Sequence, residues 1–186
     1  MKTSKFILKN FSFFLLKLIP ITVVKKKKNE LIIYVNKQKL YSILYFLNKN
    51  TQCQFKILSD LCAIDLYKQN NRFLLVYNLL SITYNTRIRI KSPVNEFDKI
   101  ISIKNIFKTS NWFEREIFDM FGLYFKSNND LRRILTDYGF EGFPLRKDFP
   151  VTGYLEIYYN EKKNKIIYKN IKLNQNFRYF TLKQFW

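Results

Sequence analysis

Residues 73–80 (FLLVYNLL) form an almost unbroken apolar run, which constrains the fold more than any other stretch of the chain. A run of this length and kind predicts a central strand in a sheet that is covered on both faces. After a polar turn, Thr86–Ile90 alternates basic and apolar residues, which is typical of a strand with one face in water. The two runs together predict a sheet that contains one buried strand and one strand with a solvent-exposed face.

Three more strands and a helix are predicted around this pair. Ile32–Val35, Phe55–Leu58 and Ala63–Tyr67 read as short strands. An amphipathic helix is expected to follow the first of them and to end near Asn48–Asn50. Its apolar residues recur at helical spacing: Leu40, Ile43, Leu44 and Leu47.

Ser92-Pro93 has the form of an N-cap followed by a first-turn proline, so a second helix is predicted there. Its buried stripe would consist of Val94, Phe97, Ile100 and Ile101.

A third helix is expected to begin at Asn111, because Glu114 three positions later completes a capping-box pattern. Gly122 is placed to end this helix. The side chains that would face inward are Phe113, Ile117, Met120 and Phe121.

From Lys126 to Gly153 the chain has little periodicity, yet it keeps many large apolar residues between its glycines and prolines. Irregular segments this long are uncommon in compact domains unless something else holds them. We therefore expect an extended arm laid over a partner, with aromatic and arginine anchors. A late hairpin is predicted from Tyr154–Tyr159 and Lys165–Tyr168.

The predicted fold class is α+β, a small mixed or mostly antiparallel sheet with packed helices, followed by an extended irregular C-terminal arm. The predicted boundaries are a basic and apolar N-terminal extension over 1–30, the α+β domain over 31–125, and a partner-binding arm over 126–186.

The apolar stretch Phe6–Val24 is interrupted by Lys9, Lys17 and Pro20, so no window reaches the roughly 18 to 20 uncharged residues of a spanning helix. No direct membrane span is therefore expected. A peripheral or partner-binding segment fits this stretch, and so does an uncleaved mitochondrial-type targeting segment, since the first 20 residues are basic and contain no acid.

Composition excludes several classes of chemistry. The 186 residues include no histidine, which removes imidazole acid–base catalysis and histidine-bound zinc. Two cysteines, Cys53 and Cys62, are too few for a four-thiolate cluster. Reduced thiols are favoured over a disulfide between them.

The formal charge of +19, from 33 Lys and Arg against 14 Asp and Glu, is typical of a protein that binds nucleic-acid phosphates. A basic RNA-binding protein, such as an organellar ribosomal protein, is therefore the alternative function. Against it, the basic residues are spread along the chain and no RRM-type aromatic signature is present.

Three motifs occur in a fixed order: WFEREIFDMFG at 112–122, DLRRILTDYGFEG at 130–142 and PLRKDFP at 144–150. In this order and spacing they closely resemble the thirty-kilodalton subunit family of respiratory complex I, the NADH dehydrogenase subunit 9 family, in its mitochondrial form. The resemblance spans roughly Cys53 to the C-terminus. The family usually has histidine where this chain has Asn128 and Phe143, so a role of those histidines in relatives cannot be carried over.

The resemblance implies assembly rather than chemistry in this chain. It implies a non-catalytic core subunit of the peripheral arm of the proton-translocating NADH:ubiquinone oxidoreductase, on the matrix side of the mitochondrial inner membrane. No flavin, iron–sulfur cluster or metal is expected in this chain; the cofactors would belong to partner subunits. The expected partners are other complex I subunits, especially those of the quinone module, rather than nucleic acid or a second copy. A stand-alone oxidoreductase is disfavoured because the sequence has no cofactor motif.

Interface and structural roles are predicted for nine charged residues of the motifs. The acidic helix positions and their neighbour would pair with basic residues of the arm or of a partner, and the alternative is a solvated helix face. The basic positions would anchor a partner, because Arg pairs bidentately with carboxylates, and the alternative is bridging within the chain. The residues are Glu114, Arg115, Glu116, Asp119, Arg132, Arg133, Arg146, Lys147 and Asp148.

Overall fold

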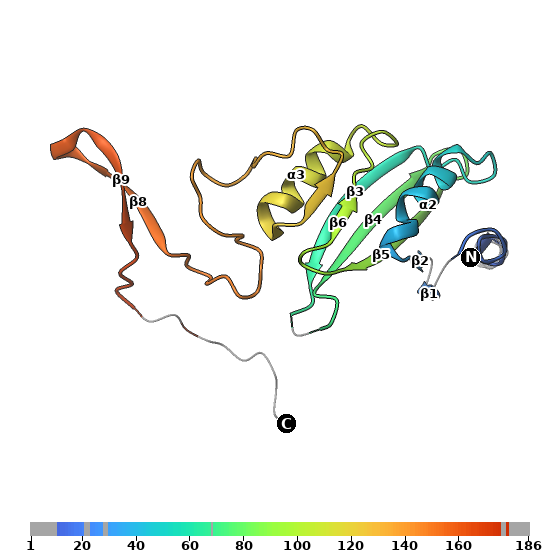
Figure 1. The fold of residues 1–186 in the computed structure, drawn as a ribbon, viewed down its shortest axis with the longest axis horizontal. Coiled ribbons are helices and arrows are strands. Elements are labelled where there is room, and N and C mark those ends of the chain that lie inside the picture. Colours follow the sequence, from blue (N-terminus) through green and yellow to red (C-terminus); the bar gives the residue numbers. More distant parts are fainter. Residues whose placement is uncertain (1–10, 21–22, 28–29, 68, 176–177, 179–186) are drawn as a thin grey trace, which may run out of the picture. The chain divides into compact units, whose positions relative to one another are not determined.

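The computed structural model describes residues 11–20, 23–27, 30–67, 69–175 and 178. The chain forms two compact units, 1–147 and 148–186 (Figure 1). The irregular residues 126–147, assigned to the arm by sequence, thus pack within the first unit.

The first unit contains a five-stranded sheet in the order β1-β2-β5-β4-β3. All neighbouring strands are antiparallel except β2 and β5, which are parallel. The predicted α+β class with a mixed, mostly antiparallel sheet is confirmed. The strands are β1 (Val23–Lys27), β2 (Glu30–Tyr34), β3 (Ile57–Asp65), β4 (Phe73–Ser81) and β5 (Thr86–Val94).

The inner position of β4 is as predicted, but it is fully covered on one face only. Phe73, Leu75 and Tyr77 are completely buried, whereas Leu74 and Asn78 on the other face are half-buried. The same open face carries the predicted wet side of β5. There Arg89 donates to the Asn78 side-chain oxygen at 2.9 Å and forms an ion pair at 3.0 Å with a glutamate of β2.

Helix α2 (Lys37–Lys49) covers the closed face, and its four predicted apolar residues are buried. Asn36 caps its start by accepting a hydrogen bond from the Gln38 N–H at 3.2 Å, and the helix ends where predicted. Residues 11–18 are also helical, and Leu15 is completely buried in the same core. Among the described residues, no helix is long and apolar enough to cross a membrane.

The prediction of two short strands over 55–67 is wrong, because β3 is one continuous strand. A β-bulge between Leu58 and Asp60 shifts its register. Asp60 does not interrupt the strand, since it accepts a hydrogen bond from the Asn78 amide on the neighbouring strand at 3.2 Å.

The prediction of a helix after Ser92-Pro93 is wrong. Strand β5 continues to Val94, and Pro93 is tolerated because the pairing with β2 stops opposite Lys91. A turn follows in which Phe97 is 93% exposed, and strand β6 (Lys99–Ile101) then pairs in parallel with β7 (Tyr124–Lys126).

Helix α3 (Ser110–Phe121) is the predicted third helix, and Ile117, Met120 and Phe121 face inward as expected. The prediction of a capping box is wrong, since the N-cap residue is Thr109, whose side chain makes no capping hydrogen bond. Gly122 ends the helix as predicted, with φ +75° and its N–H bonded to the Phe118 carbonyl at 2.9 Å.

The second unit contains the predicted hairpin. Strands β8 (Leu155–Asn160) and β9 (Lys165–Asn170) pair in antiparallel fashion around the short 3-10 helix η1 (Glu161–Lys163).

Candidate functional site: a clamped loop and its arginine anchors

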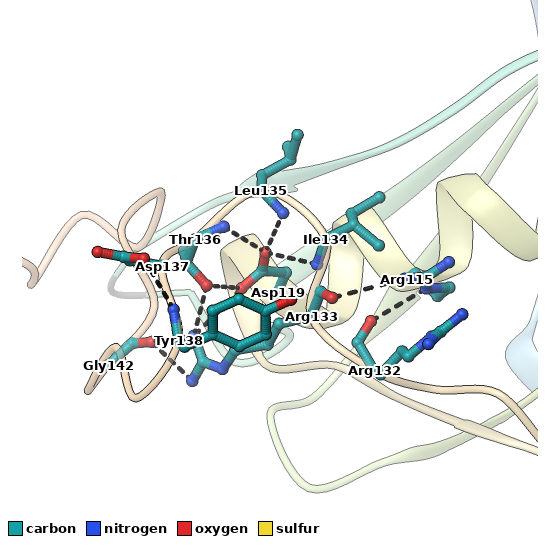
Figure 2. Close-up of polar contacts among 10 residues, drawn as sticks. All are labelled: Arg115, Asp119, Arg132, Arg133, Ile134, Leu135, Thr136, Asp137, Tyr138 and Gly142. Atoms are coloured by element: carbon teal, nitrogen blue, oxygen red, sulfur yellow. Dashed lines mark hydrogen bonds and ion pairs between the residues drawn. The ribbon is translucent and has the colours of Figure 1, made fainter.

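Asp119 lies on the buried face of α3, where its side chain is completely inaccessible to solvent. Its Oδ2 accepts from the backbone N–H groups of Ile134, Leu135 and Thr136 at 3.2, 2.8 and 2.9 Å (Figure 2). Its Oδ1 accepts from the Thr136 hydroxyl at 2.6 Å and from Arg133 at 3.1 Å. One carboxylate therefore fixes the path of the DLRRILTD motif.

The pKa of Asp119 reflects two opposing influences. Burial by itself raises it, but the hydrogen bonds from Thr136, Leu135 and Ile134 outweigh burial and hold the pKa below its ordinary value. Asp119 is thus a structural anion rather than a proton donor at neutral pH.

Two arginines complete the clamp. Arg115, itself 7% exposed, donates to the carbonyls of Arg132 at 3.1 Å and Arg133 at 3.5 Å. Arg133 donates through both terminal nitrogens to the Gly142 carbonyl at 3.1 Å. The predicted pairing of α3 with basic residues of the irregular segment is thus present within the chain for Asp119 and Arg133.

Glu114, one turn from Asp119, has a separate environment. Its oxygens accept from the Ser102 hydroxyl at 2.7 Å, the Ile103 N–H at 2.9 Å and the Asn128 amide at 2.9 Å. Burial nevertheless outweighs these bonds and raises the pKa of Glu114. Asn128 is therefore a buried partner of a carboxyl group.

Arg146 anchors the end of the irregular segment. Its Nε donates to the Phe121 carbonyl at 2.6 Å, and its guanidinium forms an ion pair with Glu96. The guanidinium lies 4.5 Å from the centroid of the Phe143 ring. Both side chains pack over Gly122, where an added Cβ would come within 2.6 Å of each.

Three residues of a neighbouring polar cluster were missed by sequence reasoning: Asp65, Arg72 and Glu96. Arg72 donates to Asp65 at 3.2 and 3.1 Å and pairs with Glu96 at 3.4 Å. Asp65 also accepts from the Lys147 N–H at 2.9 Å. Asp65 ends β3 and Arg72 precedes β4, so only the strand pairing could have indicated their proximity.

The remaining predicted residues have exposed side chains, although the Arg132 carbonyl and the Lys147 N–H take part in the contacts above. Glu116 is exposed, and Arg132, whose side chain is 73% exposed, pairs with Asp130 at 2.9 Å. The side chains of Lys147 and Asp148 are exposed, and Asp148 belongs to the second unit.

Both cysteines are free thiols, in agreement with the favoured alternative. Burial raises the pKa of Cys53 to about 11, so this thiol is unreactive at neutral pH. In the part of the chain that the structure describes, no group of three or more His, Cys, Asp or Glu residues could hold a metal ion.

These features define a small α+β domain with a clamped irregular segment and an attached hairpin unit. The family model of the respiratory-chain NADH dehydrogenase 30 Kd subunit matches residues 33–155. The chain belongs to this family, which confirms the resemblance seen in its motifs.

The chain is similar to mitochondrial relatives over most of its length. It is 45% identical over 181 residues to the NADH-ubiquinone oxidoreductase subunit 9 of Reclinomonas americana, covering 96% of this chain and 89% of the relative. It is 53% identical over 155 residues to the mitochondrial NADH dehydrogenase (ubiquinone) iron-sulfur protein 3 of Candida albicans. That match covers 83% of this chain and 56% of the relative, so the chain spans little more than half of the Candida protein.

The fold is shared with a chain of the membrane-bound sulfane sulfur reductase, an archaeal respiratory membrane complex, at a TM-score of 0.67 and 22% identity. The match covers 95% of this chain and 97% of the archaeal one. The comparisons support the respiratory family and not the RNA-binding alternative.

Proposed function

We propose that this chain is a non-catalytic structural and assembly subunit of the peripheral arm of a mitochondrial NADH:ubiquinone oxidoreductase, on the matrix side of the inner membrane. In this role it supports electron transfer from NADH to ubiquinone, coupled to proton translocation, by holding other subunits of the complex, especially those of the quinone module. Flavin and iron–sulfur clusters belong to those partners.

The observation that carries the structural role is the apolar face of the β8–β9 hairpin. The strand register places five apolar or aromatic side chains on one face, and they remain between 49 and 62% exposed. An isolated two-stranded hairpin is marginally stable in water, so a face of this kind requires a partner. The five residues are Leu155, Ile157, Tyr159, Ile166 and Tyr168.

The non-catalytic part of the proposal rests on how the motif charges are used. Asp119, Arg133, Arg115 and Arg146 all bind backbone carbonyls, backbone N–H groups or each other. Side chains committed in this way fix the shape of a segment, which is the role of a structural residue.

The proposal is tested with a tagged chain expressed in mitochondria that lack their own copy. Mild detergent extracts are separated on native gels and stained for NADH dehydrogenase activity. The tagged chain should migrate with the activity and remain with it after a high-salt wash. Sedimentation with ribosomes instead would refute the assignment, and NADH oxidation by the purified chain alone would refute its non-catalytic part.

Neighbouring tyrosines on opposite faces of the hairpin supply a matched pair. Tyr159→Ser alters the apolar face, whereas Tyr158→Ser alters the opposite face, where Lys169 lies 5.7 Å from its ring. Tyr159→Ser should reduce incorporation into the complex and Tyr158→Ser should not. Equal incorporation of both variants would contradict docking through the apolar face.

A further inference from the structure

Residues 133–142, here called the Tyr138 loop, are closed at the base by polar contacts. Both terminal nitrogens of Arg133 donate to the Gly142 carbonyl at 3.1 Å, which joins the two ends. Asp119 holds the first half through Ile134, Leu135 and Thr136. Contacts within the chain itself therefore fix the conformation of the loop.

The tip of the loop is a tight turn that presents one aromatic ring to solvent. The Phe140 N–H donates to the Asp137 carbonyl at 3.1 Å, and Gly139 supplies the left-handed conformation with φ +73°. Tyr138 lies between Asp137 and Gly139 in the sequence of this turn and is 99% exposed. Phe140, in contrast, lies with its ring 5.9 Å from the Arg133 guanidinium.

The charge around the tip is opposite to that of the chain. The loop contains two carboxylates, Asp137 and Glu141, against one basic residue, Arg133 at its base, although the chain has 33 basic residues and 14 acidic ones. Both carboxylate residues are exposed. Nucleic acid and anionic lipid would be repelled by this tip, whereas a protein pocket with a basic rim would attract it.

We propose that the Tyr138 loop is a preformed plug that inserts its tyrosine ring into an apolar, Lys/Arg-rimmed pocket of a neighbouring protein subunit. The inference rests on the proposed function, because the pocket belongs to a subunit of the same oxidoreductase. A fixed loop loses little conformational entropy on binding, and tyrosine is among the residues that most often dominate interface energies.

The test uses the full chain, tagged, in mitochondria lacking their own copy. Tyr138→Ala is expected to lower the tagged chain recovered with the complex after a high-salt wash by about tenfold, as expected for an interface hot spot. Tyr138→Phe should retain the wild-type level, because it keeps the ring. Tyr45→Ala is the matched control, since Tyr45 is 49% exposed on α2, outside the loop. Glu141→Lys should lower recovery of the tagged chain more at low salt than at high salt, because salt screens the repulsion between the new lysine and a basic pocket rim.

Four results would overturn the inference. Recovery of Tyr138→Ala equal to that of Tyr45→Ala, with the wild-type chain in the complex, refutes the plug and leaves the proposed function standing. A wild-type chain that does not enter the complex refutes the proposed function and the plug together. A urea midpoint of purified Tyr138→Ala well below that of wild type, or binding of purified chain to phosphatidylserine vesicles that depends on Tyr138, would assign the ring to its own chain or to a membrane.

Discussion

Replacing Asp119 by asparagine removes the charge that organises the DLRRILTD segment while keeping the size of the side chain. The amide has one acceptor oxygen where the carboxylate has two, so either the three N–H donors or Arg133 must face an NH2 group. Hydrogen bonds to charged groups contribute roughly 1.5–3 kcal/mol each, and removing one partner of a buried pair costs about 3–5 kcal/mol. Because the Arg133 side chain is 29% exposed and water recovers part of that loss, we expect a cost of about 3 kcal/mol.

Urea unfolding followed by tryptophan fluorescence measures this cost. Trp112 lies on α3 beside Arg115, and Trp186→Phe in all variants leaves it as the single reporter. With a denaturant slope of about 2 kcal/mol/M, the midpoint of Asp119→Asn should fall by about 1.5 M at pH 7. Glu116→Gln, the same chemical change at an exposed position of the helix, should shift it by less than about 0.3 M.

The pH dependence provides a second check. Since the folded-state pKa of Asp119 lies below its ordinary value of 3.8, its stabilisation is complete above that value and is lost as pH falls through the folded pKa. The gap between wild type and Asp119→Asn should therefore be constant from pH 7 to 5 and narrow below pH 4. A gap under 0.3 M at pH 7, or an equal gap at pH 3 and pH 7, would refute the clamp.

Three further predictions use the same unfolding assay. Gly122→Ala should cost about 2–4 kcal/mol, whereas Gly139→Ala, at nearly the same φ but with open space around it, should cost only the backbone term of about 1–2 kcal/mol; equal costs would contradict the close packing at Gly122. Arg146→Lys should lower the free energy of unfolding by about 1–2 kcal/mol, because the guanidinium contacts are lost. Lys147→Ala should lower it by less than about 0.5 kcal/mol, and a larger loss for Lys147→Ala than for Arg146→Lys would contradict the prediction. Because burial raises the pKa of Glu114 in the folded state, wild type should lose stability as pH rises from 4.5 through this raised pKa. Glu114→Gln should not show this loss, and parallel pH profiles of the two proteins would contradict the prediction.

Much of the fold follows from local pattern, and the errors occur where tertiary pairing overrides it. The amphipathic spacing of Leu40 to Leu47 determines α2, and Gly122 determines the end of α3. Ser92-Pro93 has helix-start chemistry, yet pairing of β5 with β4 extends the strand across it. Local preferences differ by a few tenths to 1 kcal/mol, which several ladder hydrogen bonds and buried side chains exceed.

The candidate site was predictable in its residue types but not in its partners. Asp119 and Arg133 stand out in the motifs, but that they meet depends on the return of the irregular segment along α3. Asp65 and Arg72 are seven positions apart across a strand pair, and Glu96 lies 50 positions from Arg146, so no spacing rule connects them. Contacts of this kind are set by topology, which the local sequence does not encode.

The contacts of Asn128 show what this position requires. Asn128 donates its amide to Glu114 at 2.9 Å and accepts the Asp130 N–H at 3.2 Å, so the position needs one donor and one acceptor. A neutral imidazole also offers one donor and one acceptor, so a histidine would satisfy both contacts. An amide does not titrate, however, so in this chain any proton exchanged at this contact must reside on Glu114, whose raised pKa favours its protonated form. The wild-type pH profile near this residue should therefore reflect a single carboxyl group, and replacing Asn128 by histidine should add a second transition near pH 6.5.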